Sequence, residues 1–259
     1  MSMRFLSTIA QGANHIWRFL MPPRCIVCKR PLGEGEKYIC TPCMMHVPLT
    51  HIHGERGNGF ERLFWMKLPI ERASAFMSYT QEENSRKLLM AAKFFSHPDI
   101  GVYLGEIMAD DLLDTDFFDG IDFIVPVPLH KKRFQERGYN QSEQLARGVA
   151  NLTHLPINTT AVVRSRYAQT QSCQRFQDRA ANVKDAFSLA HPEEIQGKHI
   201  LIIDDVITSG STITACATAA AAAEGVRISI LAFALAGSHH SSATYYEPTE
   251  TLPAFPMGK

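Results

Sequence analysis

The sequence predicts an α/β protein in which a parallel sheet flanked by helices follows a small cysteine-rich module. Two observations predict this class. Across residues 120–238, short β-branched runs alternate with helix-forming stretches, the order expected of strands joined by crossover helices. Upstream, four of the six cysteines form two C-x-x-C pairs. A composition of 45% hydrophobic and 20% charged residues is that of a globular chain, which excludes wholesale disorder and a pure coiled coil.

The first segment, residues 1–24, predicts an amphipathic helix, because its apolar residues fit one broad helical face: Phe5, Ile9, Ile16, Phe19 and Leu20. A signal peptide is the less favoured interpretation, since the apolar core is shorter than export requires. We expect no membrane span, because the long uncharged run 206–223 is rich in Thr, Ser, Gly and Ala. Without an export signal we expect a cytoplasmic protein whose cysteines stay reduced.

The cysteine module, residues 25–60, has the spacing C-x2-C-x11-C-x2-C. Each pair predicts a tight knuckle, and two knuckles close a tetrahedral site whose four soft thiolates suit structural zinc. The predicted ligands are Cys25, Cys28, Cys40 and Cys43. An iron–sulfur cluster and a redox pair are the alternatives. The nearby histidines His46, His51 and His53 are interpreted as surface residues, and the isolated Cys216 as a small core residue.

The next stretch, residues 61–119, is predicted to form a helical hood. Between residues 82 and 113, apolar side chains recur at helix spacing on both sides of Pro98. No repeat or low-complexity linker interrupts the chain here.

The domain at residues 120–238 is predicted to hold buried parallel strands. A helix follows Asn140, with Glu143 three residues later completing a capping-box-like pair. An alanine-rich helix over 211–224 is closed by Gly225. Residues 239–259 are read as a C-terminal tail. The strands are expected at 121–125, 199–203 and 226–235.

The most informative segment joins the strand at 199–203 to the helix that starts near Ser211. Asp204 and Asp205 end the strand, and a small hydroxyl-rich loop follows. Backbone N–H groups and hydroxyls at a helix N-terminus form an anion site, and Gly210 lets a phosphate approach the backbone. The two carboxylates suit vicinal ribose hydroxyls, directly or through Mg²⁺. The predicted phosphate-binding residues are Thr208, Ser209, Gly210, Ser211 and Thr212.

The alternative for this segment is a strand–turn–helix crossover without a ligand, which two adjacent aspartates after four apolar residues disfavour. It is not a Walker A loop, because no Gly-Lys-Ser/Thr follows. The segment closely resembles the phosphoribosyl-pyrophosphate (PRPP) signature of type I phosphoribosyltransferases, with Thr208-Ser209-Gly210 as a mild departure from its usual ending.

Further residues along the chain form a recognisable set: Pro126-Val127-Pro128-Leu129, Arg133, Arg137-Gly138-Tyr139-Asn140-Gln141, Arg164, Gln169-Thr170-Gln171, Arg175, Arg179, Asn182 and Phe187. In these residues the chain, from about Cys25 to Leu235, resembles the ComF family. That family joins a cysteine zinc module to a phosphoribosyltransferase-like domain and is tied to bacterial competence and DNA uptake.

The resemblance implies a type I phosphoribosyltransferase-like fold and a division of roles. The loop that holds pyrophosphate matches Pro128, Arg133, Arg137, Asn140 and Gln141, with Lys131 and Lys132 adding positive charge. A flexible catalytic loop matches the stretch from Arg164 to Asn182. The implied catalytic residues are Asp204, Asp205, Arg164, Arg175 and Arg179, with Arg166 as a further candidate.

Two functions are consistent with these residues. In the first, Mg²⁺-bound pyrophosphate leaves C1 of PRPP and a nitrogen nucleophile attacks, as in the family. In the second, the pocket binds a nucleotide or the 5′-phosphate end of single-stranded DNA without turnover, and a competence helicase is a partner implied by the family. Aromatic residues near the basic loops can stack on bases: Phe134, Tyr139, Tyr167 and Phe176.

The charge distribution supports an anionic ligand although the formal net charge is zero, from 26 Lys+Arg against 26 Asp+Glu. Residues 106–122 hold seven acids and no Lys or Arg, whereas residues 131–184 hold ten Lys+Arg and three acids. The zero sum therefore hides an acidic stretch and a separate group of basic loops.

Overall fold

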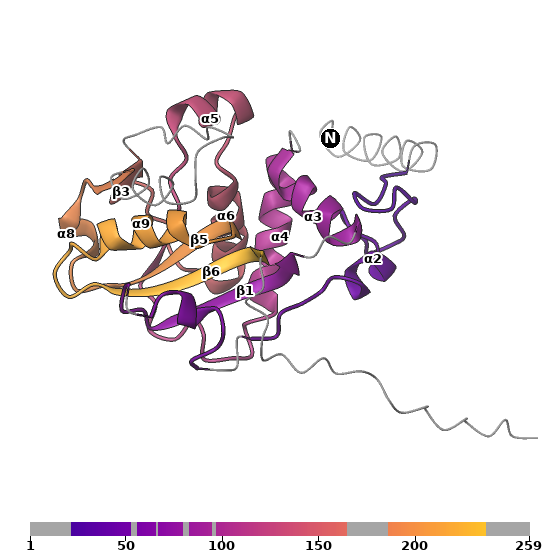
Figure 1. Cartoon of the computed structure of the whole chain (residues 1–259). Coiled ribbons are helices and arrows are strands. Elements are labelled where there is room, and N and C mark those ends of the chain that lie inside the picture. Colours follow the sequence, from indigo (N-terminus) through magenta and orange to yellow (C-terminus); the bar gives the residue numbers. More distant parts are fainter. Residues whose placement is uncertain are drawn as a thin grey trace, which may run out of the picture.

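The centre of the molecule is a four-stranded parallel sheet (Figure 1). The computed structural model describes residues 22–52, 56–65, 67–79, 83–94, 97–164 and 186–236. The strand order is β1 (Arg72–Tyr79), β6 (Arg227–Ala236), β5 (His199–Ile207) and β2 (Phe123–Pro126). All three pairings are parallel, so the carboxyl ends of the strands meet at one edge. This confirms the predicted α/β class and parallel sheet.

Strand β1 was not expected, since the sequence analysis described residues 61–119 as helical. It reads Arg-Ala-Ser-Ala-Phe-Met-Ser-Tyr, with none of the β-branched residues that are typical of a strand. Its first six residues are buried, and Ala73 and Ala75 are each 1% exposed. Pairing with β6 and burial on both faces therefore decide its structure, rather than local propensity. Within the same stretch, the expected helices are present as α3 (Glu83–Phe94) and α4 (Pro98–Asp110).

Helices cover both faces of the sheet. Leu201 and Ile203 of β5 pack in one cluster with α3, α4 and α6 (Gln141–Thr153), whereas Ile200 and Ile202 pack in a second cluster with α9 (Ser211–Ala220). This alternation is that of a strand buried on both sides. Shorter helices are α2 (Thr41–Met45), η1 (Glu61–Leu63), α5 (Lys131–Arg137) and α8 (Pro192–Ile195), and strands β3 (Val162–Arg164) and β4 (Phe187–Leu189) form a separate antiparallel pair.

Helices α4 and α6 cross at very short distance because glycines face each other. A Cβ added at Gly105 would lie 2.1 Å from the carbonyl oxygen of Leu145, and one at Gly148 would lie 2.0 Å from that of Val102. No larger residue fits either position without separating the helices. The crossing fixes α6, whose first turn reaches the carboxyl edge of the sheet.

Two local expectations were wrong. The side chain of Asn140 does not cap α6; its Nδ2 donates to the carbonyl oxygen of Val127, so the capping-box-like pair with Glu143 does not form. Helix α9 ends at Ala220 rather than near 224, because turns occupy the residues before Gly225, which has the expected positive φ of 69°. Cys216 is fully buried in α9, as expected.

Several expectations lie outside the described residues. These are the helix over residues 5–20, the C-terminal tail, and the segment 165–185 with Arg166, Tyr167, Cys173, Arg175, Phe176 and Arg179. Among the described residues, no helix has the length and apolar character needed to cross a membrane.

Candidate functional site

The hydroxyl-rich loop after β5 lies at the carboxyl edge of the sheet and leads directly into α9. Gly210 has φ of 74°, in the left-handed region that favours glycine, and is the N-cap residue of α9. The first helical hydrogen bond of α9 runs from the N–H of Thr214 to the carbonyl oxygen of Gly210. The N–H groups of the residues just before Thr214 therefore have no carbonyl partner within the helix. Ser209 Oγ and Ser211 Oγ lie 2.8 Å apart. Residues 206–213 and Asp204 line a small polar hollow, as an anion site requires.

The two adjacent carboxylates have different surroundings. Asp204 is 7% exposed, and its Oδ1 accepts from Ser142 Oγ at 3.0 Å and from the N–H of Asp205 at 2.9 Å. Asp205 is half-buried, and its Oδ1 accepts from the N–H of Val206 at 2.7 Å. Ser142 is a site residue that the sequence analysis missed, although it directly follows the Asn140-Gln141 motif. Ser142 connects the acidic pair to α6, the helix that crosses α4 at the facing glycines.

The basic loop between β2 and α6 stands beside this edge. Asn140 anchors it through the carbonyl oxygen of Val127 at 3.1 Å, and Arg137 donates to Gln141 Oε1 at 2.8 Å. Gln141 is 4% exposed, and its Nε2 has no hydrogen-bond partner within the described part of the chain. Pro128 is half-buried just after β2, and Arg133 is half-buried in α5. The predicted pyrophosphate-binding residues thus lie between the end of β2 and the first residue of α6, with α5 between them.

Arg164 ends strand β3 and pairs across the ladder with Phe187, whose ring centroid lies 5.0 Å from its guanidinium carbon. Burial lowers the pKa of Arg164, the charge of Arg133 lowers it further, and Asp204 opposes both. Its buried Nε has no hydrogen-bond partner among the described residues. Arg164 is therefore close enough to both Arg133 and Asp204 for their charges to act on it.

The four cysteines of the module converge. One sulfur from each of Cys25, Cys28, Cys40 and Cys43 lies within 4.8 Å of all the others. A tetrahedral Zn–S distance of about 2.3 Å places sulfurs about 3.8 Å apart, and Cys28 Sγ and Cys40 Sγ are 3.6 Å apart. The donor set and its spacing fit a closed structural metal site, most simply zinc. His46 is not part of the cluster, since its Nδ1 lies 2.6 Å from the carbonyl oxygen of Pro42.

The thiols have unequal proton affinities. Burial alone would raise the pKa of Cys40, but hydrogen bonds from the N–H of Cys43 and from Arg30 lower it to about 6. Burial raises the pKa of Cys43. Cys25 and Cys40 are at most 1% exposed and belong to the same apolar cluster as Leu104 of α4. The module is thus part of the main core.

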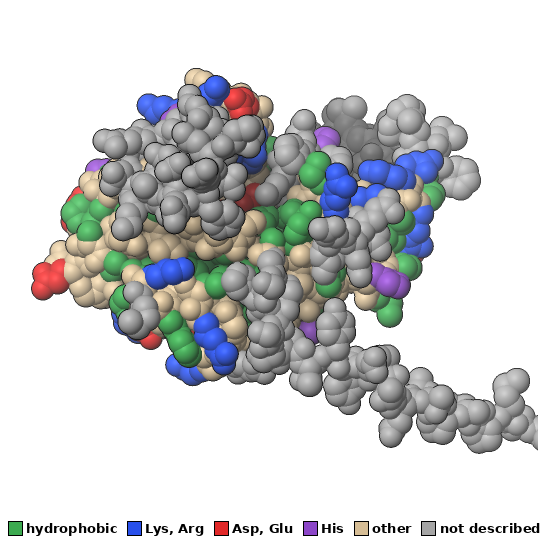
Figure 2. Space-filling model, in the orientation of Figure 1, with side chains coloured by type: hydrophobic (Ala, Val, Ile, Leu, Met, Phe, Trp, Pro, Cys, Tyr) green, Lys and Arg blue, Asp and Glu red, His purple; other side chains and the backbone are tan. Residues whose placement is uncertain are grey.

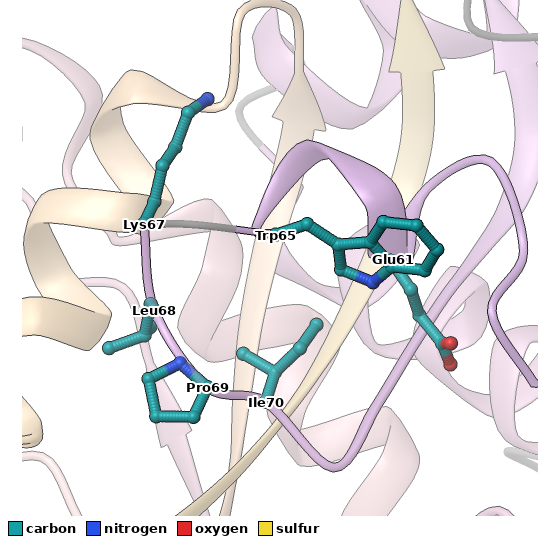
Figure 3. Close-up of a pocket in the computed structure, with 6 residues that line it drawn as sticks. All are labelled: Glu61, Trp65, Lys67, Leu68, Pro69 and Ile70. Carbon is teal, nitrogen blue, oxygen red and sulfur yellow. The ribbon is translucent and has the colours of Figure 1, made fainter.

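A larger hollow of about 610 Å³ lies at the opposite end of the sheet, before β1 (Figure 3). Its labelled residues include the half-exposed Trp65, with Leu68, Pro69 and Ile70 around the same space. The Glu61 carboxylate there accepts from the N–H of Ala73 at 3.2 Å. None of the predicted site residues lines this hollow.

Comparison with known proteins gives close relatives in sequence. No protein-family model matches the chain. The DNA utilization protein YhgH of Escherichia coli K12 is 30% identical over 208 residues, covering 74% of this chain and 88% of its own. Competence protein F of Haemophilus influenzae is 38% identical over 91 residues, covering 35% of this chain and 40% of its own.

Solved structures with a similar arrangement are more distant. Glutamine PRPP amidotransferase from B. subtilis is 21% identical, covers 55% of this chain and 30% of its own, and has a TM-score of 0.36. Hypoxanthine phosphoribosyltransferase from Trypanosoma cruzi is 12% identical, covers 53% of this chain and 78% of its own, and has a TM-score of 0.34.

Proposed function

Because the chain belongs to the ComF family of competence and DNA-utilization proteins, we propose that it binds PRPP or a related 5-phosphoribosyl ligand with Mg²⁺ at the loop between β5 and α9. One observation carries the proposal: Asp204 and Asp205 lie in the last part of strand β5, which ends at Ile207 directly before a glycine-centred hydroxyl loop at a helix start. That order matches the order of groups in the ligand, with ribose hydroxyls next to a phosphate.

Each part of the ligand has a proposed site. The 5-phosphate binds in the loop 208–212, against the first amides of α9. The ribose hydroxyls meet the two carboxylates, with Ser142 fixing Asp204. The diphosphate lies toward Arg133, Arg137 and Arg164, where positive charge stabilises it. Hard carboxylate oxygens are donors that suit Mg²⁺, which would supply charge neutralisation for the diphosphate.

If the ligand is turned over, the reaction is transfer of the ribosyl group. The bond between C1 and the diphosphate oxygen breaks with its electron pair on the diphosphate, and a nitrogen nucleophile forms the new bond at C1. The chain's own contribution is electrostatic: the arginines stabilise the departing charge, and the loop and carboxylates hold the ring in position.

A second candidate is binding of single-stranded DNA or a nucleotide without turnover. Helix α5 favours it, because Lys131 and Lys132 are exposed there and Phe134 is 47% exposed beside them. Figure 2 shows Lys and Arg side chains around this helix at the top of the molecule, and others over the cysteine module and α3. Cations next to an exposed ring suit the backbone and bases of a single strand.

Pyrophosphate release separates the two candidates. The protein is incubated with PRPP, Mg²⁺ and a panel of nitrogenous bases, and a double Asp204→Asn/Asp205→Asn variant is compared with Asp114→Asn, an exposed acid outside the site. Release that is lost only in the double variant supports transferase activity. No release with any base, together with salt-sensitive binding of single-stranded DNA that Lys131→Ala/Lys132→Ala weakens, supports the second candidate.

A further inference from the structure

Glu36 lies between the two knuckles in the sequence and accepts hydrogen bonds from residues next to both of them. Its Oε1 accepts from Arg30 Nη2 at 2.7 Å, from the N–H of Thr41 at 2.7 Å and from Thr41 Oγ1 at 3.0 Å. Its Oε2 accepts from the N–H of Gly33 at 2.8 Å. The side chain is 12% exposed. One carboxylate therefore accepts four hydrogen bonds. The donors lie up to eleven residues apart in the sequence, from Arg30 to Thr41.

These donors stand next to the cysteines. Arg30 follows Cys28 by two residues, and its carbonyl oxygen accepts from the N–H of Cys25 at 2.8 Å, which closes the first knuckle. Thr41 directly follows Cys40 and begins α2, the helix that carries Cys43. The first turn of α2 has no acidic residue and Cys40 makes no side-chain cap, so Glu36 supplies the acceptor that this helix start lacks.

Arg30 extends the contact to sulfur. Its guanidinium is within hydrogen-bonding reach of the Cys40 sulfur as well as of Glu36 Oε1. A site of four thiolates around a divalent cation has a net negative charge, so a carboxylate alone beside it would be repelled. Arg30 lies between the two negative groups and interacts with both, which accounts for a carboxylate at this place.

From this network we infer that Glu36 is the positioning residue of the cysteine metal centre. It is not a ligand, since the converging donor atoms among the described residues are the four sulfurs. It fixes the first knuckle through Arg30 and Gly33 and the second through Thr41, and so sets the angle at which the two thiolate pairs meet. Groups of this kind around metal ligands typically change metal affinity by about 10- to 100-fold.

Metal affinity of the full chain tests the role. Glu36→Gln keeps the size of the side chain but loses charge and converts an acceptor oxygen into a donor. Glu34→Gln is the matched control, because Glu34 is an exposed acid two residues earlier. We expect zinc affinity, measured by competition with a chromophoric chelator, to fall about 10- to 100-fold in Glu36→Gln and to be unchanged in Glu34→Gln. Equal affinity in the two variants overturns the proposal.

A spectroscopic measurement distinguishes positioning from simple destabilisation of the loop. With Co²⁺ in place of zinc, we expect the visible tetrahedral bands and the sulfur-to-cobalt charge-transfer band to shift or weaken in Glu36→Gln and to keep the wild-type form in Glu34→Gln. A wild-type spectrum in Glu36→Gln overturns the inference. If Glu36→Gln does not fold, Thr41→Ala removes one of the four contacts and should give a smaller loss of affinity in the same direction. Wild-type affinity in Thr41→Ala then contradicts the network.

Discussion

Replacing Gly148 by alanine tests how closely α4 and α6 cross. The added Cβ would lie 2.0 Å from the carbonyl oxygen of Val102 and 2.6 Å from the backbone nitrogen of Glu106. Both atoms belong to the backbone of α4, so no side-chain rotation relieves the overlap. The helices must therefore separate.

Two effects of opposite sign decide the magnitude. Helix propensity alone predicts that Gly→Ala in a helix stabilises by about 0.8–1 kcal/mol. Overpacking of a well-packed interface costs about 1–3 kcal/mol, and a backbone overlap of this depth places the cost at the upper end. The overpacking therefore exceeds the propensity gain, and we expect Gly148→Ala to lower the free energy of unfolding by about 2 kcal/mol.

Urea unfolding followed by circular dichroism measures this change, through a lower midpoint at unchanged slope. The control is the neighbouring Arg147, which is exposed on α6: the difference between Arg147→Ala and Arg147→Gly reports propensity alone. A Gly148→Ala variant as stable as the wild type, or more stable, would show that propensity dominates and would refute the close crossing.

Three further predictions concern the site, pH and the metal. Ser142→Ala removes a hydrogen bond to the buried Asp204 carboxylate, so the free energy of unfolding should fall by about 1.5–3 kcal/mol. PRPP affinity by calorimetry should fall as well, because Asp204 is no longer held in position; unchanged affinity would separate Ser142 from the site. Burial lowers the pKa of His199 in the folded state, so the folded protein binds fewer protons than the unfolded one. Stability should therefore fall as pH drops below about 6.5, and His199→Gln should remove that part of the pH dependence of the urea midpoint; equal slopes in both proteins contradict this. Removing the metal with a chelator should lower the melting temperature in a single transition, since Cys25 and Cys40 share a core cluster with Leu104; a separate early transition with an unchanged main one would show that the module is independent.

Local sequence pattern accounts for the central part of the fold. Residues 200–203 of β5 are four consecutive branched apolar residues, and Gly210 has the positive φ that favours glycine where the chain turns into α9, so both follow from short-range chemistry. The paired spacing of the cysteines likewise predicts their convergence, which the sulfur positions confirm.

Features that depend on tertiary packing were not predictable in this way. Strand β1 consists largely of small residues whose strand structure depends on β6, a partner far away in the chain. Ser142 and Asp204 are 62 residues apart, and the packing of α6 against the sheet brings them together. The four hydrogen bonds of Glu36 are short-range in sequence, but the cysteine spacing says nothing of which residue between the knuckles makes them.

Direct titration of PRPP with Mg²⁺ into the full-length protein, followed by calorimetry, tests the central claim that the β5–α9 loop and its acidic pair bind a phosphoribosyl ligand. The comparison is between wild type, Asp205→Asn and the exposed-acid control Asp114→Asn. We predict one binding site per chain in wild type and Asp114→Asn, and at least about tenfold weaker binding in Asp205→Asn, the loss expected for a charged hydrogen bond. Absence of binding to the wild type, or equal binding by Asp205→Asn, would contradict the account.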